Sequence, residues 1–190
     1  EEQRPVSVIF AVRSIEYEKR KEEQLLRSST TDELTRCYNR RAYEQDIKKL
    51  TADKKFLYLS ADVNGLKAVN DRLGHAAGDE LLCGVAGCMK QSFEDYGKVY
   101  RIGGDEFVTI LFTDEEQFGI IKQNFDLLVD NWSGDTVPYM SVSCGAVWSD
   151  ERQWESVREI AKLADQRMYE KKAKHYARRK SDFQNWMYKR

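Results

Sequence analysis

Apolar and polar positions alternate along the chain with two different periods, which together predict both strands and helices. An alternating run predicts a strand over residues 5–13, and a charged stretch predicts an exposed helix over 15–28. Further helices are predicted over 40–50, 76–93, 115–132 and 155–174, and further strands over 55–63, 98–102, 106–112 and 139–148. This order predicts an α+β fold, in which a central mixed antiparallel sheet is flanked by helices and one β-hairpin lies in mid-chain.

Charge and apolar content narrow the function classes. The chain has 190 residues, and its 31 basic and 32 acidic residues nearly cancel, so we expect no nucleic acid partner. No apolar run is long enough to cross a bilayer, so we expect no membrane contact in this fragment and a cytoplasmic location. The first residue is Glu1 rather than Met, and we therefore expect a piece of a longer protein, one that could be membrane-anchored.

The four cysteines do not suggest a metal site. None belongs to a C-x-x-C pair and only two histidines are present, which argues against zinc. We expect four reduced cysteines that act as small hydrophobic residues.

An acidic residue ends the strand predicted over 55–63. Asp62 is followed by Asn-Gly-Leu-Lys over residues 64–67. A carboxylate at a strand end can hold a metal ion, and the main-chain N–H groups of a following turn can bind phosphate beside Lys67. The alternative is a plain turn without a ligand.

Polar and small residues crowd between positions 70 and 79. Asn70 and Asp79 carry side chains that can read the edge of a base, and a carboxylate accepts from both N–H donors of guanine. The alternative is a loop followed by a helix cap, with Asp79 in the first helical turn. His75 is expected to support this loop rather than take part in chemistry.

Two adjacent acids follow two glycines at the predicted hairpin. In a two-residue hairpin, Gly103 and Gly104 would supply the positive φ that other residues resist. An ordinary polar turn is the alternative. If the two strands are neighbours, Asp62 and Asp105 can share Mg²⁺, which prefers hard oxygen ligands and a bound phosphate.

The segment over residues 101–108, Arg-Ile-Gly-Gly-Asp-Glu-Phe-Val, resembles the signature of the GGDEF family, the diguanylate cyclases. Three more blocks resemble this family in order and spacing: Asp-Glu-Leu-Thr at 32–35 with Asn-Arg-Arg at 39–41, Asp-Val-Asn-Gly-Leu-Lys at 62–67 with Asn70-Asp71, Gly74-His75 and Gly78-Asp79, and Ala164-Asp165 with Met168-Tyr169 and Lys172. The resemblance covers roughly residues 30–175 and implies a nucleotidyl-cyclase-like fold.

The resemblance implies a role for each matching residue. Asp62, Asp105 and the main-chain carbonyl of Val63 would bind Mg²⁺, or Mn²⁺ in its place. Glu106 would be a second-metal ligand or the base that removes the 3′-OH proton. Phosphates would contact Gly103, Gly104, Leu66, Lys67 and Lys172. Guanine would be recognised by Asn70 and Asp79. For Lys172 the alternative is a solvated helix face, since it lies among other lysines.

The resemblance also implies an activity and a domain organisation. Two GTP molecules would be joined into cyclic di-GMP, with release of two pyrophosphates, across a homodimer in which each domain binds one GTP, as part of bacterial second-messenger signalling. The alternative is a catalytically silent domain that binds GTP or cyclic di-GMP. We expect the end of an upstream sensor over residues 1–29, similar to a PAS-type strand and signalling helix, then the cyclase domain over 30–176 and an extension over 177–190. For residues 1–29 the alternative is a mere extension of the domain.

Two departures from the family pattern matter. Glu-Asp-Tyr-Gly over residues 94–97 replaces the family's inhibitory R-x-x-D site, so we expect no product inhibition there. The Gly-Arg-Asn that usually follows the closing lysine is missing; the phosphate-binding Arg is then absent or replaced by Arg178 or Arg179. His175, in the same region, is expected at the surface.

Overall fold

The computed structural model describes Tyr17 and residues 29–51 and 54–187, with side chains described as far as Ala177. The strand and helix predicted over 5–28, and with them the PAS-type sensor remnant, lie outside these residues apart from Tyr17. So do the side chains of Arg178 and Arg179. Within the described part of the chain, no helix is long and apolar enough to span a membrane.

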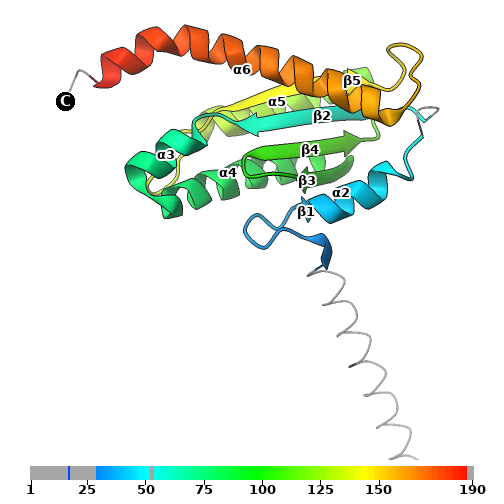
Figure 1. Ribbon diagram of the computed structural model, residues 1–190, viewed down its shortest axis with the longest axis horizontal. Coiled ribbons are helices and arrows are strands. Elements are labelled where there is room, and N and C mark those ends of the chain that lie inside the picture. Colours follow the sequence, from blue (N-terminus) through cyan, green and yellow to red (C-terminus); the bar gives the residue numbers. More distant parts are fainter. Residues whose placement is uncertain (1–16, 18–28, 52–53, 188–190) are drawn as a thin grey trace, which may run out of the picture.

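Five strands form one mixed sheet. They are β1 (Tyr38–Asn39), β2 (Leu57–Val63), β3 (Gly97–Arg101), β4 (Glu106–Leu111) and β5 (Val142–Trp148). Their order is β1-β3-β4-β2-β5, and only the β1–β3 pair is parallel. The predicted α+β fold with a mostly antiparallel sheet is therefore confirmed (Figure 1).

Helices cover both faces of this sheet, which explains why all seven residues of β2 are buried. The helices are α2 (Arg40–Ile47), α3 (Leu66–Leu73), α4 (His75–Phe93), α5 (Glu115–Asn131) and α6 (Val157–Met187). Alternate β2 residues, such as Leu57 and Leu59, share a hydrophobic core with α4 and α5. The intervening residue Tyr58 belongs to a second core, with residues of α2 and α6. Because side chains alternate along a strand, β2 contributes to both cores.

The prediction missed two elements, β1 and α3. The sequence predicts a turn over residues 64–67 and a loop before the helix cap near Asp79, but residues 66–73 form a helix of eight residues between Gly65 and Gly74, which have φ values of +78° and +87°. No residue of α3 is fully buried, and Asn70 and Asp71 have low helix propensity, so the apolar signal of this helix is weak. Helix α6 also continues well past Lys174, where the predicted helix ends.

The connection between β3 and β4 differs from the predicted two-residue hairpin. Gly65 and Gly74 are the described glycines with positive φ, so Gly103 and Gly104 do not have it. Four residues separate the two strands, and the Ile102 N–H donates to the Glu106 carbonyl at 2.9 Å. This longer loop needs no mirror-image turn. At Gly103 the constraint is space, because a Cβ there would lie 2.6 Å from Glu106 Oε2.

Candidate active site

Three acidic residues lie at one end of two neighbouring strands, β2 and β4. Asp62 is the sixth residue of β2 and is paired in register with Glu106, the first residue of β4. One residue further on, the Val63 N–H donates to the Asp105 carbonyl at 3.0 Å. The antiparallel pairing of β2 with β4 thus brings together acids that lie more than 40 positions apart in the chain.

Helix α6 adds a positive charge to this strand end. Lys172 Nζ lies 2.6 Å from Asp62 Oδ1, and the side chains of the lysine and the aspartate are 24% and 7% exposed. Two residues earlier on β2, Ser60 Oγ donates to Asp165 Oδ1 of the same helix. Two polar contacts therefore hold residues 164–172 of α6 over β2. Lys172 lies at the candidate site rather than on a solvated helix face.

Electrostatics at Asp62 favour a positively charged neighbour. Burial raises the pKa of the Asp62 carboxyl, the Lys172 ammonium lowers it, and Asp105 raises it, with a net shift upward. For Lys172, burial lowers the pKa, but Asp62 and Asp105 outweigh it and the net shift is upward. Ionisation is less favourable for Asp62 than for Lys172, because Asp62 is more buried and also lies near a second carboxylate, that of Asp105.

The arrangement fits a divalent cation. Asp62 Oδ1 is buried, and apart from its ion-pair contact with Lys172 it accepts no hydrogen bond of regular geometry. In the described part of the chain, no three His, Cys, Asp or Glu side chains are grouped as a preformed metal site. Two carboxylates at a strand end leave coordination positions for other oxygens, which suits Mg²⁺ shared with phosphates. Glu106 is exposed, with its carboxylate beside Gly103.

The segment after β2 presents a helix N-terminus. Gly65 is the N-cap of α3, and Leu66 and Lys67 are its first two residues, so their N–H groups have no carbonyl of the preceding turn as partner. Lys67 is exposed. The Gly65 N–H donates to Tyr176 Oη of α6 at 3.1 Å, a contact that the sequence did not predict.

Asn70 faces a space that exists only because Gly78 has no side chain. Asn70 Oδ1 is buried and has no hydrogen-bond partner in the structure. A Cβ at Gly78 would lie 1.8 Å from this atom. Asp79, the next residue of α4, is exposed. The two predicted guanine-recognition residues thus lie on the neighbouring helices α3 and α4, and a buried acceptor remains available at Asn70.

Two residues with structural roles at the site were missed. Asn64 is 8% exposed, donates from Nδ2 to Ser141 Oγ and accepts from Ser143 Oγ, each at 3.0 Å, which fixes the turn after β2. Arg101 donates from Nη2 to the Gly104 carbonyl at 2.8 Å. The only sequence signal for either residue is its place inside a family block.

Arg101 also connects the segment over residues 32–35 to the loop over residues 102–105. Its Nη1 lies 3.0 Å from Asp32 Oδ1. Asp32 accepts in turn from the N–H and Oγ1 of Thr35, at 2.9 and 2.7 Å. The conformation of the loop before Asp105 therefore depends on a residue 73 positions earlier in the chain.

His175 and the cysteines are placed partly as predicted. His175 is half-buried, with Nδ1 3.5 Å from Ser141 Oγ, so the prediction of a simple surface residue is wrong. His75 is the exposed first residue of α4. All four cysteines are free, and three are buried as expected, but Cys83 is exposed.

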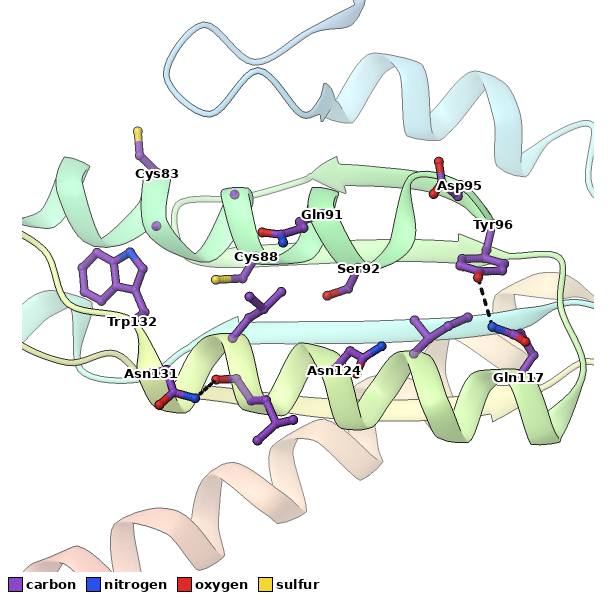
Figure 2. A pocket seen from close by; sticks show the side chains of 15 residues that line it. Cys83, Cys88, Gln91, Ser92, Asp95, Tyr96, Gln117, Asn124, Asn131 and Trp132 are labelled. Atoms are coloured by element: carbon purple, nitrogen blue, oxygen red, sulfur yellow. Dashed lines mark hydrogen bonds between the residues drawn. The ribbon is translucent and has the colours of Figure 1, made fainter.

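A separate cavity of about 870 Å³ lies between α4 and α5 (Figure 2). Its lining includes Asp95 and Tyr96, from the segment that replaces the family's inhibitory motif, and Gln117 Nε2 donates to Tyr96 Oη at 3.0 Å. None of its lining residues is Arg or Lys. The expected absence of product inhibition at residues 94–97 stays a prediction.

The chain is similar to curated proteins described as diguanylate cyclases. Over 148 residues the chain is 36% identical to the "Probable diguanylate cyclase DgcI" of Escherichia coli K12, which covers 76% of this chain and 31% of that protein. It is 33% identical over 165 residues to the "Diguanylate cyclase DgcN" of the same organism, covering 82% and 39%. The chain thus spans about a third of the length of these curated relatives.

Solved structures share the fold. The diguanylate cyclase SiaD of Pseudomonas aeruginosa, crystallised with its activator SiaC, aligns with a TM-score of 0.71 at 22% identity, over 88% of this chain and 67% of that one. The coiled coil and GGDEF domain of DgcB from Caulobacter crescentus, in complex with c-di-GMP, aligns with a TM-score of 0.71 at 21% identity, over 86% and 91%. The family described as "Diguanylate cyclase, GGDEF domain" matches residues 29–178. With that match over most of its length, the chain belongs to the GGDEF family of diguanylate cyclase domains.

Proposed function

We propose that this chain condenses two GTP molecules into cyclic di-GMP and two pyrophosphates, with Mg²⁺, across a homodimer. The observation that carries this proposal is the convergence of Asp62 and Asp105 at one strand end beneath Lys172. Family membership supports the same activity. The presence of both signature acids, Asp105 and Glu106, together with Asp62 and Lys67, weighs against a domain that only binds nucleotide.

Each domain would bind one GTP at the end of β2 and β4. Asn70 Oδ1 and Asp79 would accept hydrogen bonds from the N–H donors of guanine, which adenine presents differently. The N–H groups of Leu66 and Lys67 would bind the β and γ phosphates, beside the backbone of Gly103 and Gly104. This set holds the α-phosphate at the edge of the domain, where a partner can reach it.

Asp62, Asp105 and the Val63 carbonyl would hold Mg²⁺, which supplies Lewis-acid charge stabilisation to the phosphates. The 3′-oxygen of one GTP forms a bond to the α-phosphorus of the other, and the bond from that phosphorus to pyrophosphate breaks. Lys67 and Lys172 stabilise the charge on the leaving pyrophosphate. Glu106 takes the 3′-OH proton or contributes to a second cation. Two such transfers close the ring, so each domain is half of an active site.

The direct test is incubation of the chain with GTP and Mg²⁺, followed by identification of the product by mass. We expect cyclic di-GMP, and none with ATP or when EDTA removes the cation. Binding of a slowly hydrolysed GTP analogue without any turnover would favour the silent binding domain. A chain that neither binds nor converts GTP would contradict both.

Replacement of either signature acid should abolish the activity. We expect Asp105→Ala and Glu106→Ala each to reduce cyclic di-GMP formation by about 10³-fold, because each removes a carboxylate from the reacting centre. The far-ultraviolet circular dichroism spectrum should not change, since Asp105 lies in the loop before β4, Glu106 is the exposed first residue of that strand, and neither belongs to a core. Retained activity in either variant would exclude our assignment of that acid.

Gly78→Ala should impair nucleotide binding without harming the fold. The new methyl group would displace the Asn70 amide, so we expect KM for GTP to rise about tenfold, which corresponds to about 1.4 kcal/mol. The helix itself should gain stability, by roughly 0.5–1 kcal/mol. Gly87→Ala is the matched control, because it lies on the same helix and its new methyl group would meet no neighbouring atom within 4 Å, so KM should be unchanged. An unchanged KM in Gly78→Ala would remove Asn70 from the binding site.

A further inference from the structure

Strand β5 is the free edge of the sheet, next to β2 and opposite β1 (Figure 1). The Asn64 N–H donates to the Ser141 carbonyl, and the Ser149 N–H donates to the Phe56 carbonyl, each at 2.9 Å. In an antiparallel pair, residues alternate between facing the partner strand and facing away. The main-chain groups of Val142, Cys144, Ala146 and Trp148 therefore point outward from the sheet.

One half of this edge is capped by side chains. Arg167 of α6 donates from Nη1 to the Ala146 carbonyl at 2.7 Å, and the Trp148 N–H donates to Glu151 Oε1 at 2.9 Å. Arg167 and Glu151 are themselves paired through two contacts, at 2.9 and 2.8 Å. Capping of this kind prevents the pairing of another strand. Over the described residues, the main-chain groups of Val142 and Cys144 have no comparable partner.

The uncapped half is surrounded by positive charge. A cavity of about 340 Å³ is lined there by Lys122 from α5, by Lys171, Lys174 and His175 from α6, and by residues 142–144 of β5. Lys122 is paired with Asp126 of its own helix, at 2.6 Å. Lys171 and Lys174 are exposed and form no ion pair with a described carboxylate. Two ammonium groups without an ion-pair partner among the described residues thus lie on the α6 side of an uncapped strand edge, where Val142 is half-buried and Cys144 is 5% exposed.

From this combination we infer that the edge at Val142–Cys144 is a docking site for an extended, acidic segment of a partner protein. A strand added there would exchange main-chain hydrogen bonds with both residues. Its alternate side chains would face α6, where carboxylates would meet Lys171 and Lys174. The other side chains would face the α5 side, beside the apolar Val142, so the matching sequence alternates acidic and apolar residues.

The lysines make the site selective. Lysines at a sheet edge oppose pairing with neutral or basic strands, because their charges would be desolvated without compensation. The carboxylates of an acidic strand would compensate these charges. The two lysines therefore oppose the binding of neutral and basic strands and favour that of an acidic strand. The two lysines are separate from the proposed catalysis, since Lys171 and Lys174 line this cavity whereas Lys172 contacts Asp62. Val142 itself is the register partner of Val63.

The test uses a labelled decapeptide of alternating Glu and Val, with the Lys–Val decapeptide as its counterpart. We expect the Glu–Val peptide alone to bind, with a Kd that rises with salt. Binding should shift the amide resonances of Val142, Cys144 and Ala146, and not those of residues 103–105. The double variant Lys171→Gln/Lys174→Gln should raise the Kd at least tenfold while cyclic di-GMP formation is unchanged.

Lys162→Gln is the matched control, because Lys162 is an exposed lysine of the same helix away from the cavity, and its Kd should stay within twofold. Equal binding of the Lys–Val peptide, shifts confined to residues 103–105, or a Kd that the double variant does not change would overturn the inference. Shifts at Val142 and Cys144 that follow protein concentration alone would indicate self-association and overturn it as well.

Discussion

Asp62→Asn is expected to lower cyclic di-GMP formation by about 10³-fold while the domain remains folded. The substitution removes one of the two carboxylates that we propose bind the cation, and it leaves Lys172 without its ion-pair partner. Stability should not fall at neutral pH, because burial and Asp105 raise the pKa of Asp62, so that its charged form costs free energy in the folded state. The measurements are product formation and the midpoint of thermal unfolding.

Cation addition separates the proposed role from a structural one. With Mg²⁺ and a slowly hydrolysed GTP analogue, we expect the unfolding temperature of the wild type to rise and that of Asp62→Asn to stay constant. Asp150→Asn is the matched control, because it removes a half-exposed ion pair with Lys55 far from the site, and should leave activity unchanged. A rise in unfolding temperature of equal size in Asp62→Asn would contradict cation binding at this carboxylate.

Gly97→Asp is expected to destabilise the domain by at least about 3 kcal/mol. A Cβ at Gly97 would lie 1.9 Å from the Ile110 carbonyl oxygen and 3.1 Å from the Leu111 Cα, all main-chain atoms of the paired strand β4. Because these atoms belong to the sheet, they cannot move aside as a side chain could. Restoring the family's R-x-x-D pattern at residues 94–97 should therefore disrupt β3 rather than create an inhibitory site. Urea unfolding gives the free-energy difference.

Two single substitutions show whether the main-chain collision is the cause. Glu94→Arg changes an exposed residue after α4 and should leave the free energy of unfolding within about 0.5 kcal/mol. Gly119→Asp makes the same chemical change at an exposed position of α5 with no neighbouring atom within 4 Å, and its effect should be small. If Gly97→Asp and Gly119→Asp unfold at the same urea concentration, collision with the β4 main chain is not what constrains position 97.

The long periodic segments of the sequence predicted most of the fold, because their amphipathic patterns are produced by burial itself. β2 and α4 were found within two residues of their ends. Helix α3 escaped because it buries no residue fully, and α6 was predicted too short because its later turns leave the sheet and lose the apolar pattern. Local patterns report burial and say little about a helix that lies at the surface.

The candidate site was predicted through family blocks rather than through physical pattern. Nothing local to Asp62 indicates that Lys172 will lie 2.6 Å away, since 110 positions separate them and only the packing of α6 on β2 joins them. Asn64 and Arg101 were missed for a related reason. The sequence does not distinguish a polar side chain that forms hydrogen bonds within the fold from one that faces solvent. The glycines of the signature were predicted for the wrong property, because spacing cannot distinguish a need for positive φ from a need for space.

The contacts of Arg101 and Asn39 form a polar relay that bypasses both hydrophobic cores. Asn39 Nδ2 donates to the carbonyls of Ser29 and Thr31, at 3.1 and 3.2 Å, where the chain enters the domain. From there Asp32 binds Arg101, and Arg101 donates to the carbonyl just before Asp105. A displacement of residues 29–32 would therefore reach the carbonyl that precedes Asp105, the acid that we propose binds Mg²⁺, through polar contacts alone.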